Sequence, residues 1–199
     1  MARLALESYT STIRDAIRAR RTVFRFDPGE VPRDVLMEIL AAGTHSPNHH
    51  LTEPWRFTVV GPEMKRVLGQ RYREIQAEKC APGTAAVHVD AAAEKGWVKW
   101  MSKPTVVFVS CVLDGDAQQR REDTASVSCA MLNMQLAGCE LNVGMQWSTG
   151  PITREASTYD LLGIDAEREY IVGLCYMGYP AEVGTSTRRP VGEVTRWTD

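Results

Sequence analysis

The 199-residue sequence predicts an α+β protein in which helices outnumber strands and flank a mostly buried central sheet. Residues 105–113 and 170–180 are runs of apolar and β-branched residues without polar alternation, which is typical of strands buried on both faces. Longer segments repeat apolar residues at helical spacing. A single domain over 1–199 is long enough to bury about 70% of its unfolded surface. Hydrophobic residues make up 44% of the sequence, which is enough for a full core.

The first part of the chain predicts two helices and a short strand. Apolar residues recur at helical spacing in 11–21, where arginines crowd the last turn, and in 32–43. Pro32 suits the first turn of the second helix, and Gly43 suits its end. Residues 56–60, RFTVV, then predict a strand that follows a loop rich in histidine and proline.

The middle of the chain predicts a helix, a mixed segment and the first buried strand. Residues 61–79 have helical periodicity. Residues 80–103 combine small residues with two tryptophans, Trp97 among them, and end at Pro104. We interpret this segment as a mobile cover or a helical insertion that precedes the strand 105–113.

The last part predicts a long central helix, a strand, a short helix, the second buried strand and a tail. Residues 124–142 are small or apolar on almost all sides, which is typical of a helix at the centre of a fold or at an interface. Residues 143–148 predict a strand, and 153–163 a helix. The tail, 181–199, has little periodicity, and we expect it to pack on a partner subunit. Its apolar anchors are Pro190, Val191, Val194 and Trp197.

Charge and cysteine content exclude several classes of protein. The net charge of −2, from 23 basic and 25 acidic residues, gives no basic excess for nucleic acid or an anionic membrane surface. No segment reaches transmembrane length, and the N-terminus lacks the apolar region of a secretory signal, so we expect a cytoplasmic protein. The five cysteines include no C-x-x-C pair, which argues against a disulfide framework or a zinc site.

One stretch, HSPNHHLTEPWRF, contains three of the four histidines. His45 and His49 are four residues apart, the spacing that places two imidazoles on one helix face. Pro47 lies between them and Pro54 follows, so a helix is not expected there. We therefore predict a loop and no metal site. Exposed loop histidines and a turn that holds a ligand both remain open on these residues alone.

A basic cluster lies where the first predicted helix ends. Arg20 and Arg21 precede Thr22, Arg25 follows three residues later, and a second pair, Arg188 and Arg189, lies in the tail. Arginines at a helix C-terminus are common because they favour the helix dipole. The functional alternative is a phosphate clamp, since guanidinium groups bind phosphate oxygens in bidentate pairs. The two basic pairs would suit one dianion if the chain ends meet.

The segments IRARRTVFRF, ILAAGTHSPNHHLTEPWRFTVV and GYP with STRRPVGEV resemble, in order and spacing, the nitroreductase family of FMN-dependent oxidoreductases. The specific part is R-R-[ST]-x-x-R-F followed, after about 20 residues, by P-x6-P-W-x-F, and the resemblance covers about residues 13–197. It implies a nitroreductase-like fold with a central mixed sheet, FMN as cofactor and an intertwined homodimer.

Carried over position by position, the resemblance implies a set of FMN-binding residues and no catalytic side chain. These residues are Arg20, Arg21 and Thr22 for the phosphate and ribityl chain, Arg188 and Arg189 for a further phosphate contact, Trp147, Ser148, Thr149 and Gly150 near the reactive edge of the flavin, and His45, Pro47, Asn48 and His49 in a loop from the other subunit. Glu53 departs from the glutamine that is common in the family, and a carboxylate near the flavin would disfavour the anionic reduced ring.

The resemblance implies hydride transfer from NAD(P)H through the flavin to nitroaromatics, quinones or activated alkenes, by a ping-pong mechanism. The sequence has no G-x-S-x-G, no H-E-x-x-H and no phosphate-cradling glycine loop, as expected where the cofactor carries the chemistry. The same absence fits a protein that stores or senses flavin without turnover. A flavin-destroying or dehalogenating enzyme of the same superfamily is a further alternative.

Overall fold

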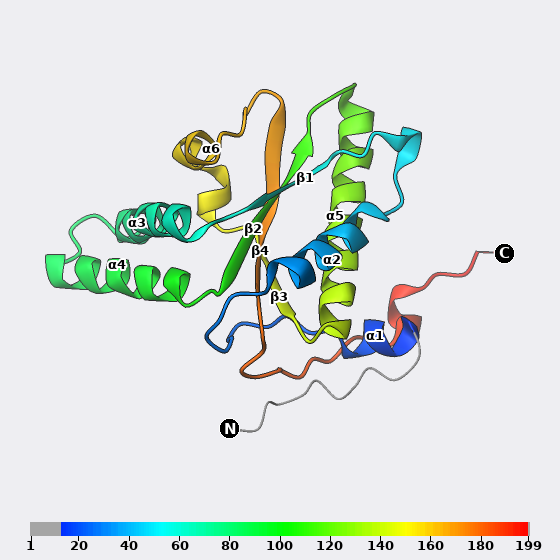
Figure 1. Cartoon of the computed structure of the whole chain (residues 1–199), viewed down its shortest axis with the longest axis horizontal. Helices are drawn as coiled ribbons and strands as arrows, with labels where there is room; N and C mark the ends of the chain where they lie inside the picture. Colours follow the sequence, from blue (N-terminus) through cyan, green and yellow to red (C-terminus); the bar gives the residue numbers. More distant parts are fainter. Residues whose placement is uncertain (1–12, 199) are drawn as a thin grey trace.

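A computed structural model describes residues 13–198 and confirms the α+β class (Figure 1). The helices of this part are α1 (Ile13–Ala19), α2 (Arg33–Thr44), α3 (Pro62–Glu78), α4 (Ala86–Met101), α5 (Ala117–Glu140) and α6 (Ala156–Leu162). The strands are β1 (Trp55–Val59), β2 (Thr105–Val112), β3 (Gly144–Ser148) and β4 (Glu169–Gly178). Short 3-10 turns lie at His49–Leu51, Pro151–Arg154 and Val191–Val194. Residues 11 and 12, where we predicted that the first helix begins, lie outside the described residues.

The four strands form one sheet in the order β1-β2-β4-β3, and every neighbouring pair is antiparallel. The expectation of a mixed sheet is corrected here, because the parallel pairing is limited to an isolated bridge between Thr22 and Met145. The physical reason lies in the connections. Helices α3 and α4 form an antiparallel pair that returns the chain to the end of the sheet where β1 stopped, so β2 must run back beside β1 (Figure 1).

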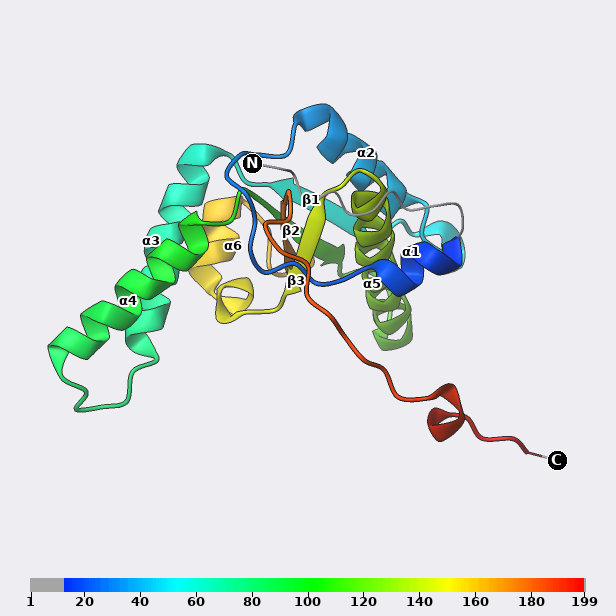
Figure 2. The same ribbon diagram turned by 90° about the horizontal axis from the view of Figure 1, so that it is seen from below.

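Two hydrophobic cores lie on opposite faces of this sheet. Helices α2 and α5 cover one face, and α3, α4 and α6 lie on the other side (Figures 1 and 2). Alternate residues of β2 enter the two cores: Val107 and Val109 pack in the first, and Val106 and Phe108 in the second. All four are fully buried, which confirms the prediction of a strand buried on both faces.

Helix α5 is longer than its predicted range, 124–142, and begins at Ala117. Asp116 caps its first turn, since its Oδ1 accepts the backbone N–H groups of Gln118 and Gln119 at 2.8 and 3.0 Å. These bonds hold the pKa of the Asp116 carboxyl below its usual value. The added turns, AQQRRED, are mostly polar and exposed, so hydrophobic periodicity did not reveal them.

The segment 80–103 contains α4, which packs against α3 on the side of the sheet opposite α5. The indole N–H of Trp100 donates to the carbonyl oxygen of Lys65 at 2.8 Å, and its ring stacks on Tyr72. These contacts hold the middle of α3 to the C-terminal part of α4.

The tail leaves the body of the molecule, and its apolar anchors are exposed (Figure 2). Trp197 is 91% exposed, and Val191 and Val194 are exposed as well. Among the described helices, none combines the length and apolarity needed to cross a bilayer.

Candidate functional site

A hollow of about 470 Å³ lies where the end of α1, the middle of α5 and β3 come together. Its volume falls within the range of about 300–1,000 Å³ that is usual for small-molecule sites. The residues that line it are Arg20, Thr22, Ser128, Cys129, Leu132, Gln135 and Trp147. Three predicted cofactor-binding residues, Arg20, Thr22 and Trp147, therefore meet in one place.

The segment after α1 is held against β3, and this contact brings the basic cluster to the hollow. Thr22 forms a parallel bridge with Met145, and the N–H of Val23 donates to the Met145 carbonyl at 3.1 Å. Val23 is 3% exposed, so its side chain anchors the segment in the protein interior. Gly144 leaves the space for it, because a Cβ there would lie 2.5 Å from Val23 Cγ2.

Arg20 is oriented by α5. Its Nη1 donates to Oε1 of Gln135 at 3.0 Å, and Gln135 is 7% exposed. A guanidinium has five N–H donors in a rigid fork, so one bond to Gln135 fixes its direction and leaves donors for an anion. Thr22 adds a hydroxyl group on the same side of the hollow. The lining thus combines a cation and hydroxyl donors with the apolar surfaces of Leu132 and Trp147.

The other predicted phosphate contacts lie elsewhere in the single chain. Arg21 Nη1 donates to the backbone carbonyls of Arg18 and Arg20 at 2.6 and 2.8 Å, so Arg21 satisfies the C-terminal end of α1. Arg188 and Arg189 are exposed in the tail, where Arg188 bonds to Ser186 and to the carbonyl of Thr187. None of the three is among the residues that line the hollow in the described chain.

Ser148, Thr149 and Gly150 follow Trp147 at the end of β3, as the strand-turn prediction required. Ser148 is half-buried and Thr149 is exposed. The neighbouring strand makes room for the indole, since a Cβ at Gly173 would lie 2.4 Å from Nε1 of Trp147. The end of β3 therefore presents a tryptophan to the hollow and then turns away into the bend at Gly150.

The histidine and proline stretch is a loop, as predicted, and it does not enter the hollow of its own chain. His45 ends α2, and His49 begins the 3-10 turn that follows Pro47 and Asn48. His50 and two later residues of this turn have positive φ without being glycine. Each such residue costs about 1–2 kcal/mol, so neighbouring contacts must hold the turn.

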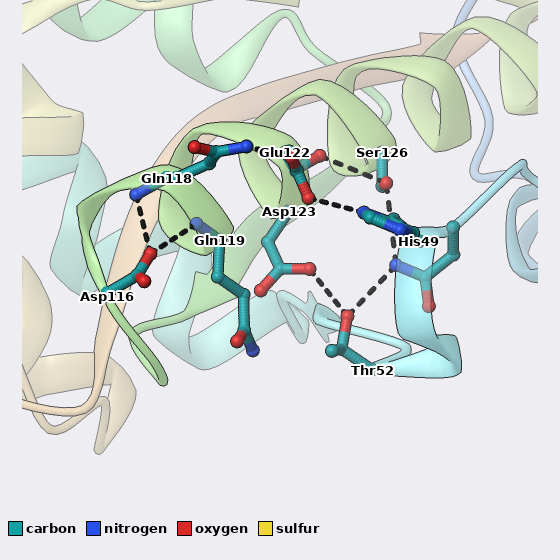
Figure 3. Close-up of polar contacts among 9 residues, drawn as sticks. His49, Thr52, Asp116, Gln118, Gln119, Glu122, Asp123 and Ser126 are labelled. Carbon is teal, nitrogen blue, oxygen red and sulfur yellow. Dashed lines mark hydrogen bonds and ion pairs between the residues drawn. The ribbon is translucent and has the colours of Figure 1, made fainter.

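Those contacts come from α5, most of them from its N-terminal half (Figure 3). Nδ1 of His49 lies 2.6 Å from Oε2 of Glu122, and the Thr52 hydroxyl donates to Oδ1 of Asp123 at 2.5 Å. Asn133 bonds to the hydroxyl of Ser46 at 2.9 Å. The hydrogen bond from His49, and then that from Gln118, lowers the pKa of the Glu122 carboxyl. Across residues 13–198, no group of three or more His, Cys, Asp and Glu side chains could hold a metal ion.

The hollow and the loop lie on two neighbouring faces of α5. Ser128, Leu132 and Gln135 are at positions i, i+4 and i+7 and line the hollow, while Glu122 and Ser126 contact the loop. At 3.6 residues per turn, these two rows are separated by a narrow strip of helix surface. The strip consists of Ala125, Cys129 and Leu136, which are exposed or half-exposed, and Cys129 also borders the hollow.

The α5 residues of the hollow are the part of the site that sequence reasoning missed. Ser128 and Gln135 are seven residues apart, two full turns, so they are polar residues on one face of a helix that is otherwise mostly apolar. That spacing was the available signal. It does not show which helix face meets the basic cluster, because that depends on tertiary packing.

The fold and the hollow together define an α+β protein with a small-molecule site between its long central helix and the edge of its sheet. The family model named "Nitroreductase family" matches residues 17–179, and the chain therefore belongs to the nitroreductase family. This result confirms the resemblance and the nitroreductase-like fold.

Relatives and solved structures agree with this assignment. The chain is 28% identical over 182 residues to "Putative NAD(P)H nitroreductase YfhC" of Bacillus subtilis, with 90% of each chain covered. It is 29% identical over 198 residues to an iodotyrosine deiodinase of Hydra vulgaris, with 90% of this chain and 70% of that protein covered. A nitroreductase with bound FMN from Bacteroides fragilis has a TM-score of 0.70 and 24% identity, with 95% of this chain and 100% of that chain covered.

Proposed function

We propose that the chain is an FMN-dependent oxidoreductase that transfers hydride from NAD(P)H, through the bound flavin, to nitroaromatics, quinones or activated alkenes. The observation that carries this proposal is the meeting of Arg20, Thr22, Gln135 and Trp147 around one hollow. Support comes from family membership and from the names of relatives, which state NAD(P)H for the Bacillus subtilis protein and FMN for the Bacteroides fragilis structure.

The residues of the hollow fit the chemical parts of FMN. The Arg20 fork and the Thr22 hydroxyl suit the phosphate, because charge-assisted bonds to phosphate are strong and directional. Ser128 and Gln135 offer polar groups to the ribityl hydroxyls, and Leu132 and Trp147 offer apolar surface to the ring. When bound, the flavin itself accepts and donates the hydride, so the protein supplies binding, orientation and exclusion of water.

We further propose a homodimer with a cofactor site at each end of its interface. The exposed strip on α5, Ala125 to Leu136, is narrow and consists of small and apolar residues, which allows two helices to approach closely. In a two-fold contact the same strip is used by both chains. Because the hollow lies on one side of the strip and the loop on the other, a two-fold axis parallel to α5 would place one chain's loop beside its partner's hollow, and this is the orientation that we propose.

This arrangement gives His45, Pro47, Asn48 and His49 the role that the resemblance implies, as a wall from the other subunit. The exposed apolar residues of α1, with Ile13 at 80% exposed, add surface next to the strip. The tail, with its exposed tryptophan, would wrap the partner, and this is how Arg188 and Arg189 would approach a phosphate.

A second candidate function is reductive removal of halogen from an aromatic substrate. The observation that favours it is the match to the Hydra vulgaris iodotyrosine deiodinase, which covers 90% of this chain. Both reactions use a flavin that stacks on a flat aromatic ring, so the cofactor site is common to them. Flavin storage or sensing without turnover is the third candidate, and it also needs the same site.

A visible spectrum of the purified protein, before and after NADPH, separates these candidates. We expect a yellow protein with about one FMN per chain, because Arg20, Thr22 and Trp147 meet at one hollow, and loss of the flavin band on reduction. FMN should bind more tightly than riboflavin, because the basic cluster acts on the phosphate. A protein that gains no flavin absorbance from added FMN would contradict the proposal. Binding without reduction by NADH or NADPH would favour storage, and iodide release from an iodophenol would favour the second candidate.

A further inference from the structure

The turn between α2 and β1 has a backbone conformation that its own residues do not favour. His50, Leu51 and Glu53 have φ values of 61°, 52° and 43°, in the left-handed region that suits glycine. Such residues persist where surrounding structure over-determines them, and they cluster at functional sites. The cause of this conformation must therefore be sought outside the turn.

The restraint comes from Asp123 of α5, through Thr52 (Figure 3). The Thr52 hydroxyl donates a hydrogen bond to Oδ1 of Asp123 at 2.5 Å and accepts one from Nδ2 of Asn48 at 2.9 Å. Oδ1 of Asn48 in turn accepts the backbone N–H of Glu53 at 2.7 Å. These three bonds join both ends of the turn to one carboxylate.

Asp123 is 2% exposed, so its bond to Thr52 is shielded from water. Low local dielectric strengthens a hydrogen bond, and a charged acceptor strengthens it further. The contact between His49 and Glu122 is more open, because the His49 side chain is 63% exposed and solvent screens the pair. The buried bond is therefore a stronger restraint on the turn than the His49–Glu122 pair.

This step rests on the proposed function, in which the turn of one chain faces the flavin of its partner. We infer that Asp123 and Thr52 are positioning residues for the hydride-transfer site. They fix the path of Pro47 to His50 without touching the cofactor. That path sets the width of the space in which a flat acceptor stacks on the ring. Hydride transfer depends steeply on this geometry, since a misplacement of about 1 Å can cost about a hundredfold in rate.

The test replaces Thr52 with valine, which keeps the shape and removes the hydroxyl. We expect amide exchange at residues 49–53 to rise about tenfold, in line with the loss of a charge-assisted hydrogen bond. The KM for a quinone acceptor should rise by about the same factor. FMN affinity should change by less than about twofold, because the lining of the hollow is untouched. Thr52→Ser, which keeps the hydroxyl, should restore both quantities.

Thr44→Val is the matched control, since the Thr44 hydroxyl donates within α2, to the carbonyl of Ala41 at 2.8 Å, and not to the network. Unchanged exchange at 49–53 in Thr52→Val would overturn the restraint. Faster exchange with an unchanged acceptor KM and an unchanged visible circular dichroism of bound FMN would overturn the positioning role.

Failure of the proposed function stays distinguishable, because the exchange measurement needs no flavin. A chain that binds no FMN refutes the cofactor assignment and the positioning role, while its exchange rates still report on the Asp123–Thr52 bond. If Thr52→Val does not fold, Asp123→Asn provides the second variant. It keeps an oxygen acceptor without the charge, so the same changes should appear at smaller size. Exchange and KM equal to those of the wild-type chain would overturn the inference.

Discussion

Arg20 and Gln135 are 115 residues apart in the sequence, and a hydrogen bond of 3.0 Å joins the guanidinium of one to the amide oxygen of the other. The bond connects the basic cluster after α1 to the buried face of α5. It also gives Arg20 a fixed direction, which distinguishes it from the arginines that only end a helix.

Replacing Arg20 with alanine should weaken FMN binding about ten- to hundredfold, because a hydrogen bond to a charged group contributes roughly 1.5–3 kcal/mol. A flavin fluorescence titration measures this change. Arg25→Ala is the control: Arg25 is exposed and pairs with Glu182 at 3.5 Å on the surface. Equal affinities for the Arg20 variant and the control would show that Arg20 is only a helix-end charge.

The dimer proposal predicts that a charge on the exposed strip of α5 separates the subunits. Ala125→Glu places a carboxylate on the strip, where burial against a second chain would be costly. The control is Ala91→Glu, an equally exposed alanine within α4. Sedimentation velocity at micromolar concentration should show a dimer for the wild type and the control, and a monomer for the Ala125 variant. A monomeric wild type that retains FMN would contradict the proposal.

Steady-state kinetics should follow a ping-pong scheme. Donor and acceptor must each stack on the exposed face of the flavin, and one face cannot hold both. No G-x-G-x-x-G fingerprint in the sequence offers a separate dinucleotide site. Double-reciprocal plots with a nitroaromatic or quinone acceptor should therefore give parallel lines. Intersecting lines, with a ternary complex trapped by a dead-end analogue, would require two separate sites.

Lys103 predicts a specific dependence of stability on pH. Lys103 is 4% exposed, and its ammonium group donates to the carbonyl of Phe24 and to Gln146 and lies 5.2 Å from the ring centres of Phe26 and Tyr176. Burial, and then the charge of Lys99, lowers the pKa of Lys103 from 10.5 to about 8. Between these values the unfolded chain binds more protons than the folded chain. The Lys103 contribution to the free energy of unfolding therefore rises as pH increases from 8 to 10.5.

Urea unfolding of the wild type and of Lys103→Met across this range checks the prediction, with Lys95→Met, a change at an exposed lysine of α4, as the control. The difference between the Lys103 variant and the wild type isolates the lysine. This difference is needed because burial raises the pKa of the Cys111 thiol to about 11. The contribution of Cys111 to the free energy of unfolding therefore falls as pH rises above about 9. A wild-type-minus-variant difference that does not grow with pH would mean that Lys103 is not a buried cation in solution.

Secondary structure was predictable where burial follows a simple period. Strand β2 was found because both of its faces are buried, so its sequence is continuously apolar. The start of α5 was missed because its first two turns face solvent and carry no apolar repeat. The antiparallel sense of the sheet was also missed. It follows from how α3 and α4 return the chain, and 80–103 had too little periodicity to show that second helix.

The candidate site was predictable where residue chemistry is unusual in itself. Arg20, Thr22 and Trp147 were identified from motifs, and the structure brings them together. Gln135 and Asp123 were not identified, because a single polar residue in a helix gives no sign of a partner distant in sequence. The left-handed turn at His50 and Leu51 had no local signal either, since neither residue is glycine or asparagine.

The pairing of Val23 with Met145 sets an order of events during synthesis. Strand β3, against which the basic cluster lies, follows that cluster by more than one hundred residues in the sequence. The arginines therefore leave the ribosome long before β3 is synthesised. Contacts at such sequence separation form late, because the entropy of closing the intervening chain must first be overcome. A nascent chain that ends before Met145 thus contains the residues that would bind the phosphate but lacks the strand that holds them in place. The cofactor would then bind only to a chain whose sheet is complete, so cofactor binding would report that folding has finished.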